Sequence, residues 1–334
     1  MLYVLLALGL VLLVAGGEAL VRGASALAGR LGVSPLLIGL TVVGFGTSTP
    51  ELVTSLQAAF AGSPGIAVGN VVGSNIANIL LILGIAALMM PFAVERQAFG
   101  RDGTALVASA VACAAIVLLG TLSRPAGAAL VVGLVAYLAY AYRSERAAPE
   151  PALAIAGGAV PVAATGTGSV PTPATATPAP DIPAMSLPVA LAWALGGIVL
   201  TVVGARLLVD AAIELAALWG VSDAVVGLTV VAVGTSLPEL VTSVVAAIRR
   251  EGAIAFGNVV GSNIYNVLGI LGVTALVKPI PVPEQIAAFD IWVMLAATGA
   301  LVWVAMTGWR VTRAEGAALL VAYAAYIGWI AAGA

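Results

Sequence analysis

Two glutamates, Glu51 and Glu239, lie in almost identical segments of the sequence: GTSTPELVTS at 46–55 and GTSLPELVTS at 234–243. The motif GNVVGSNI follows each of them at the same distance, at 69–76 and 257–264. Both motifs therefore repeat at one offset without a gap (239 − 51 = 188; 257 − 69 = 188). An ionisable side chain in an apolar helix is costly unless it faces a partner, a cavity or an ion pathway. The duplicated carboxylate therefore predicts a cation site.

Oxygen-bearing residues surround each glutamate. Thr47 and Ser48 precede Glu51 by four and three residues, which would place their hydroxyls on the carboxylate's face of a helix. Pro50 removes a helical hydrogen bond, so backbone carbonyls become free there. Carboxylate, hydroxyl and carbonyl oxygens are the ligands that Ca²⁺ and Na⁺ require. The second copy repeats this arrangement with Thr235, Ser236 and Pro238, and the following helices add Ser74, Asn78, Ser262 and Asn266.

The charges favour Ca²⁺, because two carboxylates neutralise one divalent ion, although the same oxygens could host several Na⁺ ions in adjoining subsites. A simpler interpretation is a proline kink with a protonated, hydrogen-bonded glutamate, but two copies in register argue against it. The repeated glycines are more typical of close helix packing. For Asn70 and Asn75, interhelical hydrogen bonding and a role at the site remain equal alternatives.

The composition indicates that these segments lie in a membrane. Hydrophobic residues make up 62% of the 334 positions and charged residues 8%, against roughly a quarter charged in soluble domains. Continuously apolar runs favour spanning helices over barrel strands. We expect an all-α integral membrane protein with ten spans, near 3–21, 34–60, 66–91, 104–122, 126–142, 188–208, 222–248, 253–277, 287–307 and 315–332.

The arginines predict the orientation. With the N-terminus outside, ten arginines fall on the inside and only Arg124, Arg206 and Lys278 on the outside. Both termini are then external, in a multi-pass cell (inner) membrane protein. Five spans separate equivalent points, so the second half is inverted relative to the first, an arrangement common in secondary transporters. The predicted domains are a five-helix repeat at 1–146, a disordered cytoplasmic linker at 147–187 and an inverted repeat at 188–334, with broken helices at the central ion site. The single cysteine, Cys113, predicts core packing and no disulfide.

The paired motifs in inverted five-helix halves resemble the two alpha-repeats of the calcium:cation antiporter superfamily, and most nearly prokaryotic sodium/calcium exchangers. The resemblance implies exchange of cytosolic Ca²⁺ for external Na⁺ by alternating access. Carried over by position, the calcium ligands would be Glu51, Glu239 and the backbone carbonyls of Thr47 and Thr235. The sodium subsites would use Ser48, Ser74, Ser236, Ser262 and the carbonyls of Gly44 and Ala232. Many members have an aspartate where this chain has Asn266, whereas Asn78 fits the first-repeat pattern.

Three other classes of protein can be compared with this one. A Ca²⁺/H⁺ antiporter would use the two glutamates to carry protons, and sodium-gradient assays would distinguish it. A cation channel usually builds its filter from a ring of subunits, whereas two copies in one chain already enclose a site. An enzyme is disfavoured because the chain has no histidine. We expect no cofactor, no nucleic acid and no protein partner, only Ca²⁺, Na⁺ and membrane lipid.

Overall fold

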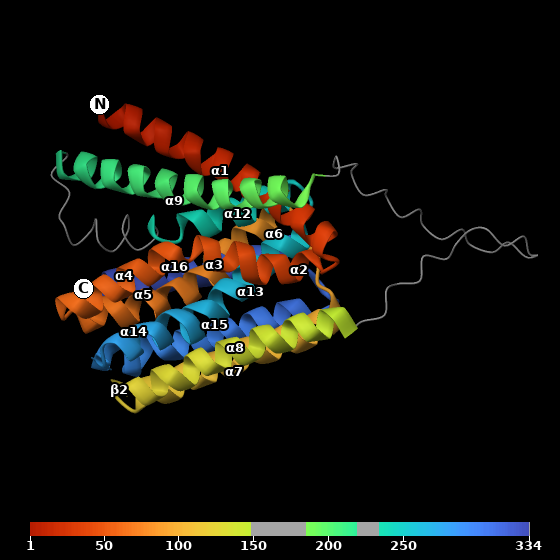
Figure 1. The fold of residues 1–334 in the computed structure, drawn as a ribbon. Coiled ribbons are helices and arrows are strands. Elements are labelled where there is room, and N and C mark those ends of the chain that lie inside the picture. The colour runs from red at the N-terminus through yellow and green to blue at the C-terminus, as the bar shows by residue number, and fades with distance from the viewer. Residues whose placement is uncertain (148–184, 219–233, 334) are drawn as a thin grey trace, which may run out of the picture.

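The computed structural model describes residues 1–147, 185–218 and 234–333, and in this part the chain is almost entirely helical. The chain's two ends lie at one end of the bundle, and the last turn of the helix at 124–147 and the first turn of the helix at 187–218 lie at the other (Figure 1). Within the described residues, eight helices are long and apolar enough to cross a membrane. A bent pair of helices at 35–61 makes nine if it counts as one span.

The described elements follow a similar order in both halves, although a π-helical turn, η5, precedes α15 in the second half only. In the first half they are α1 (Leu2–Leu31), α2 (Pro35–Ile38), η1 (Gly39–Val43), α3 (Gly44–Thr47), α4 (Thr49–Ala61), α5 (Pro64–Ala77), η2 (Asn78–Leu83), α6 (Gly84–Met89), β1 (Phe92–Ala93), α7 (Arg96–Leu118), β2 (Thr121–Leu122) and α8 (Arg124–Ala147). The later elements are α9 (Leu187–Leu218), α12 (Leu237–Ile248), α13 (Gly252–Tyr265), η4 (Asn266–Leu271), α14 (Gly272–Val277), β3 (Ile280–Pro281), η5 (Ile286–Asp290), α15 (Ile291–Met306), β4 (Arg310–Val311) and α16 (Arg313–Gly333). The segments labelled η are π-helical turns.

Helices α1 and α9 form a long antiparallel pair along one side of the bundle (Figure 1). Glycines at every seventh position let the two backbones touch, since a Cβ on Gly16 would lie 2.5 Å from the Thr201 nitrogen. The Gly197 position is equally tight, at 2.4 Å from the Leu20 nitrogen. Small residues at helix interfaces are the usual means of close packing within a membrane.

The predicted break in the first site-bearing helix is present. Segments Pro35–Thr47 and Thr49–Ala61 meet at an angle of 44°, and Ser48 between them departs from helical geometry with ψ of 10°. Pro50 follows at the start of α4, where its missing N–H costs no hydrogen bond. In the second half α12 begins with the same Ser-x-Pro sequence at Ser236. Each glutamate therefore lies in the first turn of a new helix.

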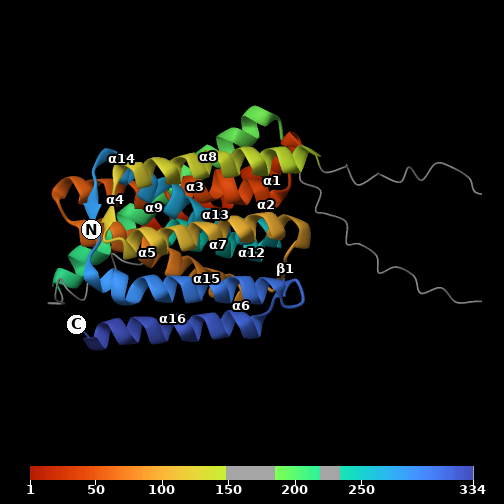
Figure 2. The ribbon, with the colours of Figure 1, turned by 90° about the horizontal axis from the view of Figure 1, so that it is seen from below.

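Four two-residue strands, which the sequence did not predict, join the halves at both ends of the bundle. Strand β1 pairs with β4, with Phe92 opposite Val311, and β2 pairs with β3, with Leu122 opposite Ile280. The repeat relates β1 to β3 and β2 to β4 (280 − 92 = 188; 311 − 122 = 189), so each strand pair is the repeat of the other. The two sheets lie at opposite ends, β2 beside the termini in Figure 1 and β1 at the far end in Figure 2.

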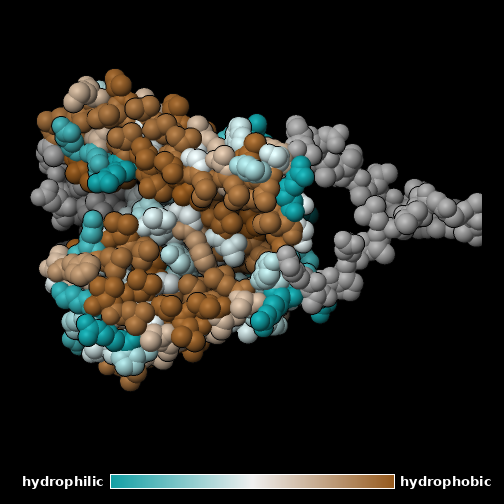
Figure 3. All heavy atoms as spheres, in the orientation of Figure 1, coloured by the Kyte–Doolittle hydropathy of each residue, from teal (hydrophilic) through white to brown (hydrophobic). Residues whose placement is uncertain are grey.

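The visible surface fits a membrane. Apolar side chains cover most of the face in Figure 3, and hydrophilic residues gather towards the two ends. Several helices are longer than predicted: α1 continues to Leu31 and α9 to Leu218. Hydropathy alone missed these ends because they carry polar residues, and Arg22 and Arg206 lie within helices rather than in loops. The predicted linker at 147–187 and the start of the span at 222–248 lie largely outside the described residues.

Candidate functional site

A crossed pair of hydrogen bonds joins the two repeated glutamates to serines of the opposite halves. The Ser48 hydroxyl donates to Glu239 Oε1 at 2.8 Å, and the Ser236 hydroxyl donates to Glu51 Oε1 at 3.2 Å. Both glutamates are only 1% exposed. Each hydroxyl thus binds the carboxylate of the opposite half. Helical spacing alone predicts that each hydroxyl lies on the face of the glutamate in its own helix, and the structure adds a bond from each to the glutamate of the other half.

Several buried oxygens at this centre have no hydrogen-bond partner. They include the second carboxylate oxygen of each glutamate, Glu51 Oε2 and Glu239 Oε2, and the amide oxygens of Asn78 and Asn266. The turn η2, which begins at Asn78, packs on α12, and η4, which begins at Asn266, packs on α4. Buried oxygens without a donor are costly in a protein interior. A cation bound among them would supply the missing interaction, so the residues fit a cation site.

Two further asparagines hold the backbones of the glutamates in place. Asn70 Nδ2 donates to the Glu51 carbonyl at 3.0 Å and to Ser55 Oγ at 2.9 Å. Asn258 Nδ2 makes the equivalent bonds, to the Glu239 carbonyl at 3.2 Å and to the hydroxyl of Ser243 at 2.9 Å. The asparagine of each GN motif therefore joins its own helix, α5 or α13, to the backbone of the glutamate on the preceding helix. For Asn70 this geometry favours the interhelical role of the two that the sequence left open.

The first broken helix is also bonded to the second half. Thr47 Oγ1 donates to the Val43 carbonyl at 3.1 Å and to Asn258 Oδ1 at 3.2 Å. Ser262 Oγ donates to the Gly44 carbonyl at 3.3 Å. Thr47 is fully buried. The carbonyl at Gly44 and the hydroxyl of Ser262, both predicted sodium ligands, are therefore adjacent.

A chain of amides links the remaining motif residues. Asn266 Nδ2 donates to Asn75 Oδ1 at 3.0 Å, and Asn75 Nδ2 donates to the Asn263 carbonyl at 3.3 Å. Asn263 Oδ1 and Thr242 Oγ1 also lack partners. Neither residue is among the site residues predicted from the sequence. Asn263 could have been found as the repeat of Asn75, and Thr242 as part of the duplicated ELVTS segment.

Three other residues were predicted for the site. Ser74 is 5% exposed in α5. Thr235 lies half-buried immediately before Ser236. Ala232 lies outside the described residues. Among the residues that the structure describes, no three acidic, histidine or cysteine side chains cluster to hold a metal. The site therefore combines two carboxylates with neutral oxygens, which is the donor set of a hard cation.

The fold is that of a multi-pass membrane protein, and a cluster of buried oxygens between its two repeated halves forms a candidate cation site. The family model "Sodium/calcium exchanger protein" matches residues 1–143 and 189–332. The chain belongs to this family, within the calcium:cation antiporter superfamily.

Individual relatives match over nearly the whole chain. The sodium/calcium exchanger MaX1 of Methanosarcina acetivorans is 37% identical, with 97% of each chain covered. The inner membrane protein YrbG of Escherichia coli is 35% identical, over 87% of this chain and 84% of its own length. A solved structure of the sodium-calcium exchanger NCX_Mj, soaked without Na⁺ and Ca²⁺, superposes with a TM-score of 0.80 at 28% identity and 98% coverage of both chains.

Proposed function

We propose that this protein exchanges Ca²⁺ for Na⁺ across the cell membrane by alternating access, and that it carries out no enzymatic chemistry. The observation that carries the proposal is the crossed arrangement of the two glutamates. Each has one oxygen held by a serine of the opposite half and one buried oxygen without a partner. Two such carboxylates match the charge of one Ca²⁺.

In this proposal Ca²⁺ binds between Glu51 and Glu239, together with the backbone carbonyls of Thr47 and Thr235. The hydroxyls of Ser48 and Ser236 orient the carboxylates towards the ion. Na⁺ ions occupy smaller subsites beside it, formed by Ser262 with the Gly44 carbonyl and, in the other half, by Ser74 with the Ala232 carbonyl. Asn78 and Asn266 contribute amide oxygens between the two types of subsite. Because both ions need the glutamates, they compete, and such competition is a requirement of exchange.

Alternating access is expected from two inverted five-helix halves, 1–146 and 188–334, joined by the segment 147–187. Several paired contacts support the inversion. The strand pairs β1–β4 and β2–β3 are repeats of each other and lie at opposite ends of the bundle. Arg124 Nε donates to the Leu276 carbonyl at 3.2 Å at one end, and Arg313 Nε donates to the Leu88 carbonyl at 3.1 Å at the other. Two openings onto one site then follow from the symmetry.

The arginine distribution supports an orientation with both termini outside and residues 147–187 in the cytoplasm. In that orientation the Ser34 end of the first broken helix faces the cytoplasm. A sodium gradient directed inwards would then drive Ca²⁺ out of the cell.

Transport in proteoliposomes tests the proposal. Vesicles loaded with Na⁺ and diluted into Na⁺-free buffer containing ⁴⁵Ca²⁺ should accumulate the isotope, and vesicles loaded with K⁺ should not. An imposed proton gradient without Na⁺ serves as the second comparison. Uptake driven by protons and indifferent to Na⁺ would instead identify a Ca²⁺/H⁺ antiporter, and conductance without coupling would identify a channel.

A further inference from the structure

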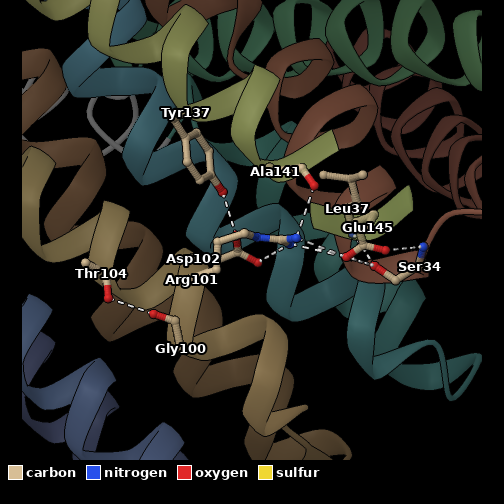
Figure 4. A network of polar contacts seen from close by, with 9 residues as sticks. All are labelled: Ser34, Leu37, Gly100, Arg101, Asp102, Thr104, Tyr137, Ala141 and Glu145. Atoms are coloured by element: carbon tan, nitrogen blue, oxygen red, sulfur yellow. Dashed lines mark hydrogen bonds and ion pairs between the residues drawn. The ribbon is translucent and has the colours of Figure 1, made fainter. Parts of the chain in front are cut away.

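A buried ionic network lies apart from the ion site, where α7, α8 and the start of α2 meet (Figure 4). Arg101 donates from Nε to Asp102 Oδ1 at 2.6 Å and from Nη1 to Glu145 Oε1 at 3.3 Å. The Tyr137 hydroxyl donates to Asp102 at 3.0 Å. The side chains of Arg101 and Asp102 are 7% and 1% exposed, and that of Glu145 is 13% exposed. Charges buried in this way within membrane helices usually have a specific role.

The network ends on the residue that starts the first site-bearing helix. Glu145 Oε2 accepts the backbone N–H of Ser34 at 3.0 Å, and Oε1 accepts the Ser34 hydroxyl at 3.0 Å. Ser34 is the N-cap of α2, and its Oγ accepts the N–H of Leu37. Every carboxylate oxygen of Asp102 and Glu145 has a donor, so the network leaves no oxygen for another cation. The network instead attaches α8 to the N-terminus of α2, where a carboxylate is favourable.

The helix attached by Ser34 packs on α13 with almost no space between the backbones. A Cβ added to Gly257 would lie 2.5 Å from the Leu36 carbonyl oxygen, and one on Gly261 would lie 2.3 Å from that of Leu40. Further along the same helix, Gly44 accepts from Ser262 and Thr47 donates to Asn258. These contacts hold the Ser34 end of the helix against α13. Opening at that end requires this helix to separate from α13.

The second half lacks the ionic part of the network. Asp290 is the repeat of Asp102 and accepts from the Tyr326 hydroxyl at 2.9 Å, as Asp102 does from Tyr137. The residue equivalent to Arg101, however, is Phe289 (289 − 101 = 188), which stacks on Tyr326 with ring centroids 6.3 Å apart. The offset places Gly333 or Ala334 at the position of Glu145. The positions equivalent to Arg101 and Glu145 therefore carry no charged side chain in the second half.

We propose that Arg101 and Glu145 are positioning residues for transport, which hold the first site-bearing helix against α13 and make opening at the Ser34 end less favourable than opening at the other. The inference rests on the proposed alternating-access function. It makes the two openings of a symmetric scaffold unequal. Neither residue is one of the proposed ion ligands, and both act through Ser34.

Cysteine labelling tests the inference without relying on transport. In a Cys113→Ser background, a cysteine replacing Leu40, which is 1% exposed against α13, should react slowly with a membrane-impermeant maleimide. Adding Glu145→Gln should raise the labelling rate from the Ser34 side about tenfold. Adding Tyr326→Phe, which breaks the equivalent bond in the half without the ionic attachment, should leave it unchanged. An unchanged rate with Glu145→Gln, or the same increase with Tyr326→Phe, would overturn the inference.

Transport from each face supplies the second readout. Because apparent affinity at a face scales with the fraction of protein open to it, Glu145→Gln should tighten the apparent Ca²⁺ affinity at the Ser34 face by up to about tenfold. The affinity at the opposite face should stay constant or weaken. Ser34→Ala combined with Glu145→Gln should give less than the product of the separate effects, since both act on one contact. Weaker affinity at both faces would indicate general damage to the site and contradict the inference. If the wild type failed to exchange Na⁺ for Ca²⁺, the proposed function would fall, and the labelling result would still stand.

Discussion

Ser48 donates its hydroxyl hydrogen to Glu239, a residue 191 positions away in the other half of the chain, at 2.8 Å. Ser236 makes the corresponding bond to Glu51. Each half therefore orients the carboxylate of the other, and the ion site exists only when both halves are in place.

Glu51→Gln and Glu239→Gln should each abolish Ca²⁺ transport while the protein still folds. An amide removes one of the two negative charges that a divalent ion requires, but it relieves the cost of burying a carboxylate. The measurement is ⁴⁵Ca²⁺ uptake, normalised to protein that elutes as a single species in size-exclusion chromatography. Exchange at the wild-type rate in either variant would refute the assignment of that glutamate.

Ser48→Ala and Ser236→Ala should weaken apparent Ca²⁺ affinity about tenfold each, equivalent to about 1.4 kcal/mol, which lies near the usual worth of a hydrogen bond to a charged group. The carboxylate would remain present but would lose the donor that orients it. Thr49→Ala is the matched control, because the Thr49 hydroxyl donates only to the Phe45 carbonyl on the exposed side of the helix. Equal effects of all three substitutions would argue against the crossed arrangement.

Asn266→Asp should change the dependence on Na⁺, K⁺ and pH more than it changes Ca²⁺ binding. Asn266 Oδ1 is buried without a partner near the two glutamates, so an ionised aspartate would add a third negative charge to the site. If repulsion keeps the new carboxylic acid protonated, the variant should gain a further pH dependence in addition to that of the wild type. Transport measured under Na⁺ and K⁺ gradients at several pH values distinguishes these cases. A variant identical to the wild type in all three respects would place position 266 outside the ion shell.

Acidic pH should weaken apparent Ca²⁺ affinity. Protons and Ca²⁺ compete for the same carboxylate oxygens, so cation binding releases protons and a higher proton concentration opposes it. The inhibition should be competitive: high Ca²⁺ should restore the maximal rate at moderately low pH. A fall in maximal rate with constant apparent affinity would indicate that protons act elsewhere in the protein.

Gly16→Ala should impair assembly of the α1–α9 pair, because the added Cβ would lie 2.5 Å from the Thr201 backbone nitrogen. Gly29→Ala in the same helix is the control, since a Cβ there meets nothing within 4 Å of it among the described residues. We expect lower thermal stability in detergent and reduced transport for Gly16→Ala only. Equal thermal stability of the two variants would show that the close helix contact is not required.

Much of this account could be predicted from the sequence because the repeat is nearly exact around the glutamates. The helix break at Pro50, the buried carboxylates and the oxygen-rich surroundings follow from local residue chemistry. The sequence did not predict which groups would meet: helical spacing places Ser48 on the face of Glu51, whereas the Ser48 hydroxyl donates to Glu239 in the other half. Long-range pairs such as Phe92 with Val311, and the attachment of Ser34 to Glu145, have no local signal.

Ca²⁺ binding to the purified protein tests the central claim most directly, namely that Glu51 and Glu239 form one shared cation site. Calorimetric titration in Na⁺-free buffer should show one saturable Ca²⁺ site per chain in the wild type. Added Na⁺ should compete for it, and the Glu51→Gln/Glu239→Gln double variant should bind no Ca²⁺ there. Saturable binding of one Ca²⁺ by the folded double variant, with wild-type affinity, would contradict the account.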